Sequence, residues 1–341
     1  MNAPSTRLPV SAYDIAAWIV AGVALLLVLK LHLLPALLAG LLVFELVHIL
    51  ARRLHVWRLA RSRGKLIAVA FIAIVTVTLL TLAIVGAVAF FRSDAGSLPA
   101  LMRRLAEIIE HSRQHMPEWV AEYIPANADA LKTSTAQWLR EHAAELQTIG
   151  RDAGRAFAHV LIGMIIGAIV SLHEVREGEE SGPLAIALRQ RAAKLGNAFR
   201  RVVFAQVRIS ALNTTLTAIY LMAVLPAFGV HLPLAKTLVL ITFVAGLLPV
   251  IGNLISNTVI FIVSLSHSLV VALAALGYLI VIHKLEYFVN ARIVGTRIDA
   301  RAWELLLAMM TMEAAFGIGG VIAAPIYYAY LKDELNSRGL I

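Results

Sequence analysis

Amide side chains that could bind a polar solute lie inside apolar sequence in the C-terminal half of this 341-residue chain. Gln206 and Asn213 share one apolar run, and Asn253 and Asn257 lie one helical turn apart further along. Neutral amides at membrane depth suit a hydroxylated neutral solute, but they also join helices or replace backbone hydrogen bonds lost at a break. Both roles stay open, and we assign all four residues to a predicted substrate path.

Two glutamates lie in or beside apolar runs and extend this predicted path. Glu286 is followed one turn later by Asn290, and Glu313 lies near the first third of the run 303–331. An ionisable group at membrane depth requires a partner or a water path. Either carboxylate could therefore line a permeation path or a proton-linked site. The structural alternatives are a solvated helix end for Glu286 and an interhelical hydrogen bond for Glu313.

Signatures of catalysis and of metal binding are missing from the sequence. His173-Glu174 lacks the second histidine of H-E-x-x-H, and no G-x-S-x-G or P-loop motif occurs. The chain has no cysteine, which excludes disulfides, thiolate metal sites and cysteine nucleophiles. We therefore expect no enzyme activity, no metal and no cofactor.

The element that must position the polar groups is the stretch 237–283, which contains no Asp, Glu, Lys or Arg. As one helix it would reach roughly 70 Å, more than twice a hydrocarbon core of about 30 Å. Pro249 and Gly252 interrupt it, and broken backbone at membrane depth survives only where protein or water covers it. The sequence therefore predicts a re-entrant or broken-helix hairpin at 249–252, with Pro249 and Gly252 beside the substrate path.

Composition predicts the fold class. The chain is 60% hydrophobic and 15% charged, with a mean hydropathy of +0.81. We therefore expect an all-α, polytopic membrane protein with about eight membrane segments. The apolar runs are 15–30, 31–50, 66–91, 156–173, 202–225, 235–252, 255–283 and 303–331. The net charge of +9 does not indicate nucleic acid, because Lys and Arg cluster beside apolar runs, where they contact lipid headgroups.

Charge distribution divides the chain into four predicted regions. The N-terminal spans, 1–91, enclose the loop 51–65, which holds six basic residues from Arg52 to Lys65 and no acid, so this loop and the N-terminus should be cytoplasmic. Residues 92–155 carry mixed charge and helically spaced apolar residues, which predicts an external insert of amphipathic helices. A fourth span with a cytoplasmic amphipathic segment, 156–201, and a transport-type membrane region, 202–341, complete the chain.

Glycines indicate close helix packing at two places. Gly163 and Gly167 form a G-x-x-x-G step, which permits close approach of another helix. Gly317 and Gly320, followed by Pro325, lack the pattern of a dinucleotide fingerprint. We interpret them as a hinge or a close crossing of helices.

The order of motifs from 200 to 335 resembles that of a known family. The motifs are Ala205-Gln206, Leu248-Pro249-Val250-Ile251-Gly252, Leu285-Glu286 with Asn290, Ile293-Val294-Gly295, and Gly317-Ile318-Gly319-Gly320 with Ala324-Pro325. Together they resemble the AI-2E family, the autoinducer-2 exporter family of bacterial inner-membrane transporters. The chain is identified as a divergent member because Ala205, Asn253 and Ala291 replace residues usual in the family.

The resemblance implies a multi-pass protein of the bacterial inner membrane that assembles as a homopentamer and moves cargo by an elevator-like displacement. The first hypothesis is export of a small polar solute resembling autoinducer-2. The second is Na⁺(Li⁺)/H⁺ antiport, in which Glu286 or Glu313 binds a proton and the cation in turn. The third, from another class, is a non-transporting membrane scaffold whose external helices recruit envelope partners.

Overall fold

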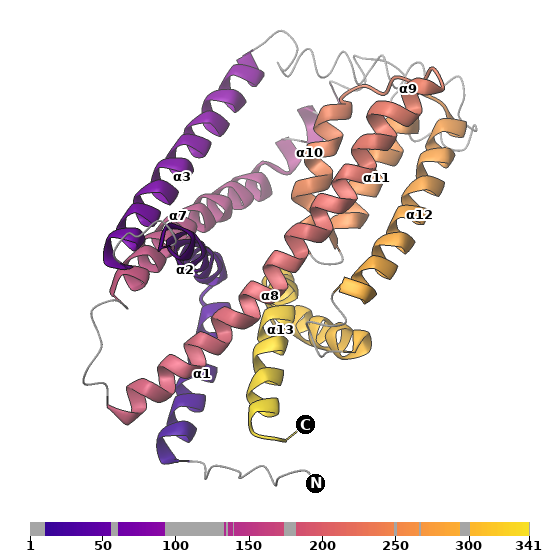
Figure 1. Ribbon diagram of the computed structural model, residues 1–341. Helices are drawn as coiled ribbons and strands as arrows, with labels where there is room; N and C mark the ends of the chain where they lie inside the picture. Colours follow the sequence, from indigo (N-terminus) through magenta and orange to yellow (C-terminus); the bar gives the residue numbers. More distant parts are fainter. Residues whose placement is uncertain are drawn as a thin grey trace. The chain divides into compact units, whose positions relative to one another are not determined.

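Every described element of the chain, seen in a computed structural model, is helical (Figure 1). The structure describes residues 11–55, 61–92, 133, 136–138, 140–173, 182–248, 251–265, 267–293 and 301–340. Within these ranges, 5 helices are long and apolar enough to cross a membrane, and shorter apolar helices accompany them. The predicted all-α, polytopic membrane fold is confirmed. Most of the predicted external insert lies outside the described residues.

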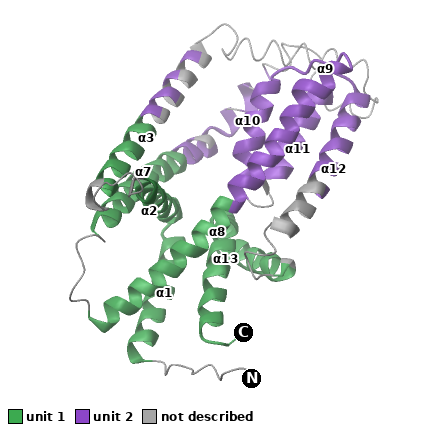
Figure 2. Ribbon diagram, viewed as in Figure 1, with its two compact units in different colours: residues 1–77, 151–204, 297–341 green, residues 78–150, 205–296 purple. Residues whose placement is uncertain are grey.

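The chain folds into two compact units (Figure 2). Unit 1 comprises Met1–Val77, Arg151–Phe204 and Arg297–Ile341, and unit 2 comprises Thr78–Gly150 and Ala205–Thr296. Unit 1 therefore combines segments from both ends of the chain. The four regions predicted along the sequence stay a prediction.

Three helices belong to unit 1 alone: α1 (Ala12–Lys30), α2 (Leu34–His55) and α13 (Ala302–Ser337). Three contribute residues to both units: α3 (Arg61–Arg92), α7 (Ala143–His173) and α8 (Pro183–Ile219). Unit 2 also contains the π-helix η1 (Tyr220–Val224), α9 (Leu225–Ala227), α10 (Ala235–Gly246), α11 (Ile251–Leu265) and α12 (Leu269–Ile293).

Glycine lets α2 and α7 approach closely in unit 1. A Cβ atom at Gly163 would collide with the carbonyl of Ala36, and one at Gly167 would collide with the carbonyl of Gly40. Any larger residue at either position would push the two backbones apart. The G-x-x-x-G step therefore lies at a helix contact in which backbone meets backbone.

A charged cluster joins α1, α8 and α13 within unit 1. Asp14 accepts a hydrogen bond from Arg191 at 2.8 Å and pairs with Arg338 at 3.0 Å, and Glu334 pairs with Lys194 at 2.7 Å. Arg191 is 3% exposed, so its charge is compensated by these neighbours instead of by water. The cluster holds the ends of three helices that are distant in sequence.

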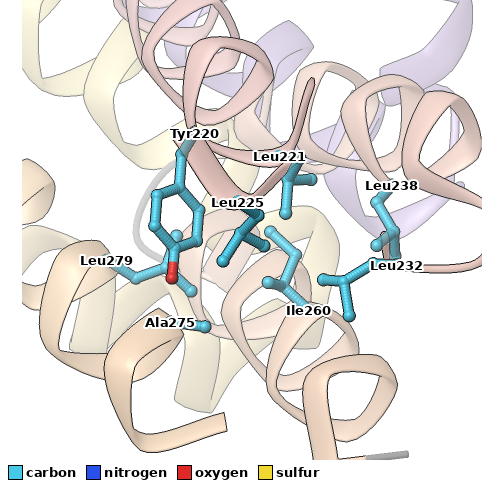
Figure 3. Packing of buried hydrophobic residues seen from close by; sticks show 8 residues of the cluster. All are labelled: Tyr220, Leu221, Leu225, Leu232, Leu238, Ile260, Ala275 and Leu279. Carbon is cyan, nitrogen blue, oxygen red and sulfur yellow. The ribbon is translucent and has the colours of Figure 1, made fainter. Parts of the chain in front are cut away.

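The core of unit 2 is apolar and lies where η1 meets α10, α11 and α12. Figure 3 shows its eight residues, and among them Leu221 and Ile260 are almost fully buried. Two short helices, α10 and α11, pack against each other, and α11 also packs against α12. At 1.5 Å per residue α10 is roughly 18 Å long and α11 roughly 22 Å, so neither reaches across a hydrocarbon core of about 30 Å. Together they have the dimensions of a re-entrant hairpin.

Candidate transport site

A polar stripe runs along the part of α8 that belongs to unit 2. It consists of Gln206, Ser210, Asn213 and Thr217, which follow one another at intervals of three or four residues and so share one helix face. Ser210, Asn213 and Thr217 are buried, and Gln206 is half-buried. The stripe faces α10 and the start of α11, because its hydrogen-bond partners lie there.

The first two residues of the stripe compensate for the end of α10. Gln206 donates from its side-chain amide to the carbonyl of Gly246 at 2.7 Å, and Ser210 donates to the carbonyl of Phe243 at 2.7 Å. The last carbonyls of a helix have no partner within it, and lipid offers none. Side chains of α8 thus stabilise the broken backbone. Replacing lost backbone hydrogen bonds is one of the roles that the sequence predicts for amides in this region.

Glycines bring the two arms of the α10–α11 hairpin together. A Cβ atom at Gly252 would collide with the carbonyl of Ala245, and one at Gly246 would lie 2.6 Å from the hydroxyl oxygen of Ser210. Both glycines are buried. Gly252 is therefore required for close packing immediately after the break, while Pro249 lies outside the described residues.

Asn213 and Asn253 connect α8 directly to α11. The side-chain amide of Asn213 donates to the Oδ1 atom of Asn253 at 3.0 Å. Further along the chain, Leu221 of η1 and Ile260 of α11 belong to one core cluster. Asn257 is half-buried and follows one turn after Asn253 on α11.

Three hydroxyl groups that follow Asn213 on α8 and η1 are buried without a hydrogen-bond partner among the described residues. They belong to Thr214, to Thr217, which is 0% exposed, and to Tyr220, which is 5% exposed. Tyr220 stacks on Tyr278 with ring centroids 4.0 Å apart, and its hydroxyl lies on the side of Ala275 and Leu279 (Figure 3). Buried polar groups without partners are costly, and in native proteins they commonly contact water or a ligand.

A π-helix follows the polar stripe on the same chain segment. In η1, Leu225 donates its backbone N–H to the carbonyl of Tyr220, five residues earlier. Next to it, the hydroxyl of Tyr278 donates to the carbonyl of Leu216 at 3.1 Å, which ties α12 to α8. Single π-helical turns are frequent at functional sites because they re-aim side chains on an otherwise regular helix.

The two predicted carboxylates lie on other helices than the stripe, and their part in the substrate path stays a prediction. Glu286 and Asn290 lie on α12, in unit 2, but their side chains are outside the described part. Glu313 lies on α13, in unit 1, where its side chain is exposed. The polar groups gathered at the α10–α11 hairpin are neutral amides and hydroxyls.

A second broken helix is found in α13. Gly317 has φ 62° and ψ −145°, values nearly restricted to glycine, and it divides α13 into a first arm (302–316) and a second arm (318–337). A Cβ atom at Gly320 would collide with the carbonyl of Met312, so the arms fold back on each other. Pro325 lies inside the second arm.

Several residues of the site were not predicted from the sequence. Serine and tyrosine are common in apolar membrane helices, so Ser210, Tyr220 and Tyr278 do not stand out by residue type. The spacing of Ser210 from Gln206 and Asn213 was the available signal, since it completes a single helical face. Nothing in the sequence indicated the tyrosine stack.

Comparison with known families assigns the chain to a family of membrane proteins. The model of the AI-2E family transporter family matches residues 15–337. The chain belongs to the AI-2E transporter family. No curated protein and no solved structure matches it significantly.

Membership of the AI-2E family extends the resemblance from the C-terminal motifs to nearly the whole chain. It identifies this polytopic protein as a member of a membrane transporter family. The polar stripe of α8 and the α10–α11 hairpin therefore belong to a member of a transporter family.

Proposed function

We propose that this AI-2E family member exports a small, neutral, polar solute resembling autoinducer-2 across the bacterial inner membrane. The observation that carries the proposal is the set of buried hydroxyls on Thr217 and Tyr220 that have no partner among the described residues. They continue the stripe from Asn213, so hydroxyl donors and acceptors follow one another along the end of α8 and the start of η1. A polyhydroxylated solute offers the matching groups.

The predicted substrate path would run along α8 past Gln206, Asn213, Asn253 and Asn257. Gln206 is engaged with the backbone of α10, so its part would be to hold the hairpin. Asn213 and Asn253 bond to each other, and a solute would compete for that bond. We also propose that the protein assembles as a homopentamer with a cytoplasmic N-terminus, and that an elevator-like movement carries the site. Short broken helices suit such a movement, because they line sites near the middle of the bilayer.

The test is transport by the purified protein in proteoliposomes. The flux of an autoinducer-2-like polyol and of Na⁺ is measured with and without a proton gradient. Thr217→Val removes a buried hydroxyl, while Thr215→Val removes an exposed one whose hydroxyl bonds within its own helix. We expect Thr217→Val to lower polyol flux by roughly tenfold, as loss of one hydrogen bond to cargo would, and Thr215→Val to leave it unchanged.

The other hypotheses predict different results in the same assay. Na⁺/H⁺ antiport predicts Na⁺ flux that depends on pH and is lost in Glu286→Gln or Glu313→Gln. A scaffold predicts no flux of either cargo, and retention of its role by residues 92–155 on an unrelated membrane anchor. Equal polyol flux in Thr217→Val and Thr215→Val would overturn the assignment of the stripe.

A further inference from the structure

We propose that the first arm of α13 is a lid that is hinged at Gly317 and held closed by the carboxylate of Glu304. The lid lies in unit 1 and does not depend on which cargo is carried. Three features support it: a hinge, a latch at the opposite end of the arm, and a difference in how firmly the two arms are held.

The hinge is the break at Gly317. A Cβ atom placed there would meet nothing within 4 Å, so no neighbour clamps the residue. Its φ of 62° belongs to a region that side-chain-bearing residues rarely adopt. Rotation about one such residue would move the whole first arm, while the helical hydrogen bonds within each arm stay intact.

The latch is a set of hydrogen bonds to one oxygen atom. Oε2 of Glu304 accepts from the hydroxyl of Tyr328 at 2.5 Å and from the ammonium of Lys332 at 2.9 Å, both on the second arm. The same oxygen accepts from the backbone N–H of Arg301 at 3.3 Å, which caps the start of the first arm. Glu304 lies roughly 20 Å along the helix from Gly317, so the latch is at the end of the first arm that is distant from the hinge.

The second arm is anchored in unit 1. Ala323, Ile326 and Ala329 are buried in its apolar clusters, and Glu334 joins the charged cluster of Arg191. These contacts involve α1, α2 and α8, so the second arm would stay in place when the first arm moves.

The first arm is held more weakly. Met312 and Phe316, both near the hinge, are the first-arm residues that pack against an apolar cluster of described residues, and Met309 is buried. Four large apolar side chains along the arm are exposed instead: Trp303, Leu306, Leu307 and Met310. Away from the hinge, the polar contact between the arms among the described residues is therefore that of Glu304.

The absence of native cysteine makes a direct test possible. Spin labels on Met310→Cys and Leu331→Cys, at positions 69% and 52% exposed on the two arms, report the distance between the arms by double electron–electron resonance in lipid nanodiscs. The labelled chain is diluted with an excess of unlabelled chain, so that distances within one protomer dominate. In the otherwise unchanged chain we then expect one dominant short distance. Glu304→Ala should shift the closed-to-open ratio by roughly tenfold or more and add a longer distance, because bonds to a charged group are strong.

Two further variants make the result specific. Asp333→Asn removes a carboxylate that pairs with Arg201 of α8, so it breaks an ion pair of α13 that does not join the arms. It should leave the distance unchanged. Glu304→Lys combined with Lys332→Glu restores opposite charges across the arms, so this pair should return most of the short distance that Glu304→Lys alone loses.

The lid is contradicted if Glu304→Ala keeps the short distance, or if it opens no further than Asp333→Asn. Should Glu304→Ala not assemble, Tyr328→Phe removes one donor to the same oxygen and should open the arms to a smaller extent. An unchanged distance in an assembled Tyr328→Phe protein would also count against the latch. Because the readout is a distance, a negative transport assay leaves the inference standing, and a rigid α13 leaves the proposed function standing.

Discussion

The side-chain amide of Asn213 donates a 3.0 Å hydrogen bond to the Oδ1 atom of Asn253, which joins α8 to the helix that follows the chain break. Asn213 is buried, and the two residues are 40 positions apart. Amide pairs of this kind hold membrane helices together where the apolar surroundings offer little specificity. The pair also holds the first turn of α11 against α8. Beyond Asn213, the next residue of the stripe, Thr217, has no hydrogen-bond partner among the described residues.

We expect the Asn213–Asn253 pair to contribute about 1 kcal/mol of coupling, in the range of interhelical hydrogen bonds in membranes. The variants are Asn213→Leu, Asn253→Leu and the double variant, and the free energy of unfolding is measured for each. The double variant should be less destabilised than the sum of the single ones. Additive losses would mean that the bond contributes no coupling of its own.

Gly252→Ala should destabilise unit 2 by about 1–3 kcal/mol, because its new Cβ atom would collide with the carbonyl of Ala245. Gly277→Ala is the matched control: it lies in α12 with nothing within 4 Å of the added atom. That substitution should stabilise the protein slightly, since alanine favours a helix over glycine. Thermal unfolding of both variants shows whether each substitution raises or lowers the unfolding temperature. Equal changes in unfolding temperature would rule out a tight contact at Gly252.

The stacked tyrosines should respond differently to loss of their hydroxyls. Tyr278→Phe removes the bond to the carbonyl of Leu216 and should cost about 1 kcal/mol of stability. Tyr220→Phe removes a hydroxyl with no partner among the described residues, so stability should stay equal or rise. If cargo uses this hydroxyl, polyol flux should nevertheless fall in Tyr220→Phe. Stability and flux are therefore measured on the same preparations.

Arg191→Gln should lower stability by about 3 kcal/mol, because it leaves Asp14 and Glu334 with less compensation in a buried cluster. Arg201→Gln is the comparison, since Arg201 is 33% exposed and pairs with a partly exposed Asp333. Its removal should cost less than about 1 kcal/mol. Similar unfolding temperatures for the two variants would indicate that the cluster around Asp14 is not essential to unit 1.

The membrane class and the helical hairpin could be read from the sequence because they depend on local physics. A stretch without charge from 237 to 283 exceeds the bilayer, and Pro249 with Gly252 offers the place to turn. Gly320 and Pro325, which follow Gly317, likewise indicate a hinge or a close crossing of helices. The family resemblance rested on the same local motifs, and the family match covers residues 15–337.

Only the tertiary structure decided which polar groups meet. Gln206 reaches the carbonyl of Gly246, Asn213 reaches Asn253, and Glu304 reaches Tyr328 and Lys332, all across distances along the chain that no local pattern encodes. Asn213 belongs to unit 2 and Glu313 to unit 1, and their place in one substrate path stays a prediction. Composition and helical period set the elements, whereas the contacts between elements depend on how their faces pack, which a single sequence leaves open.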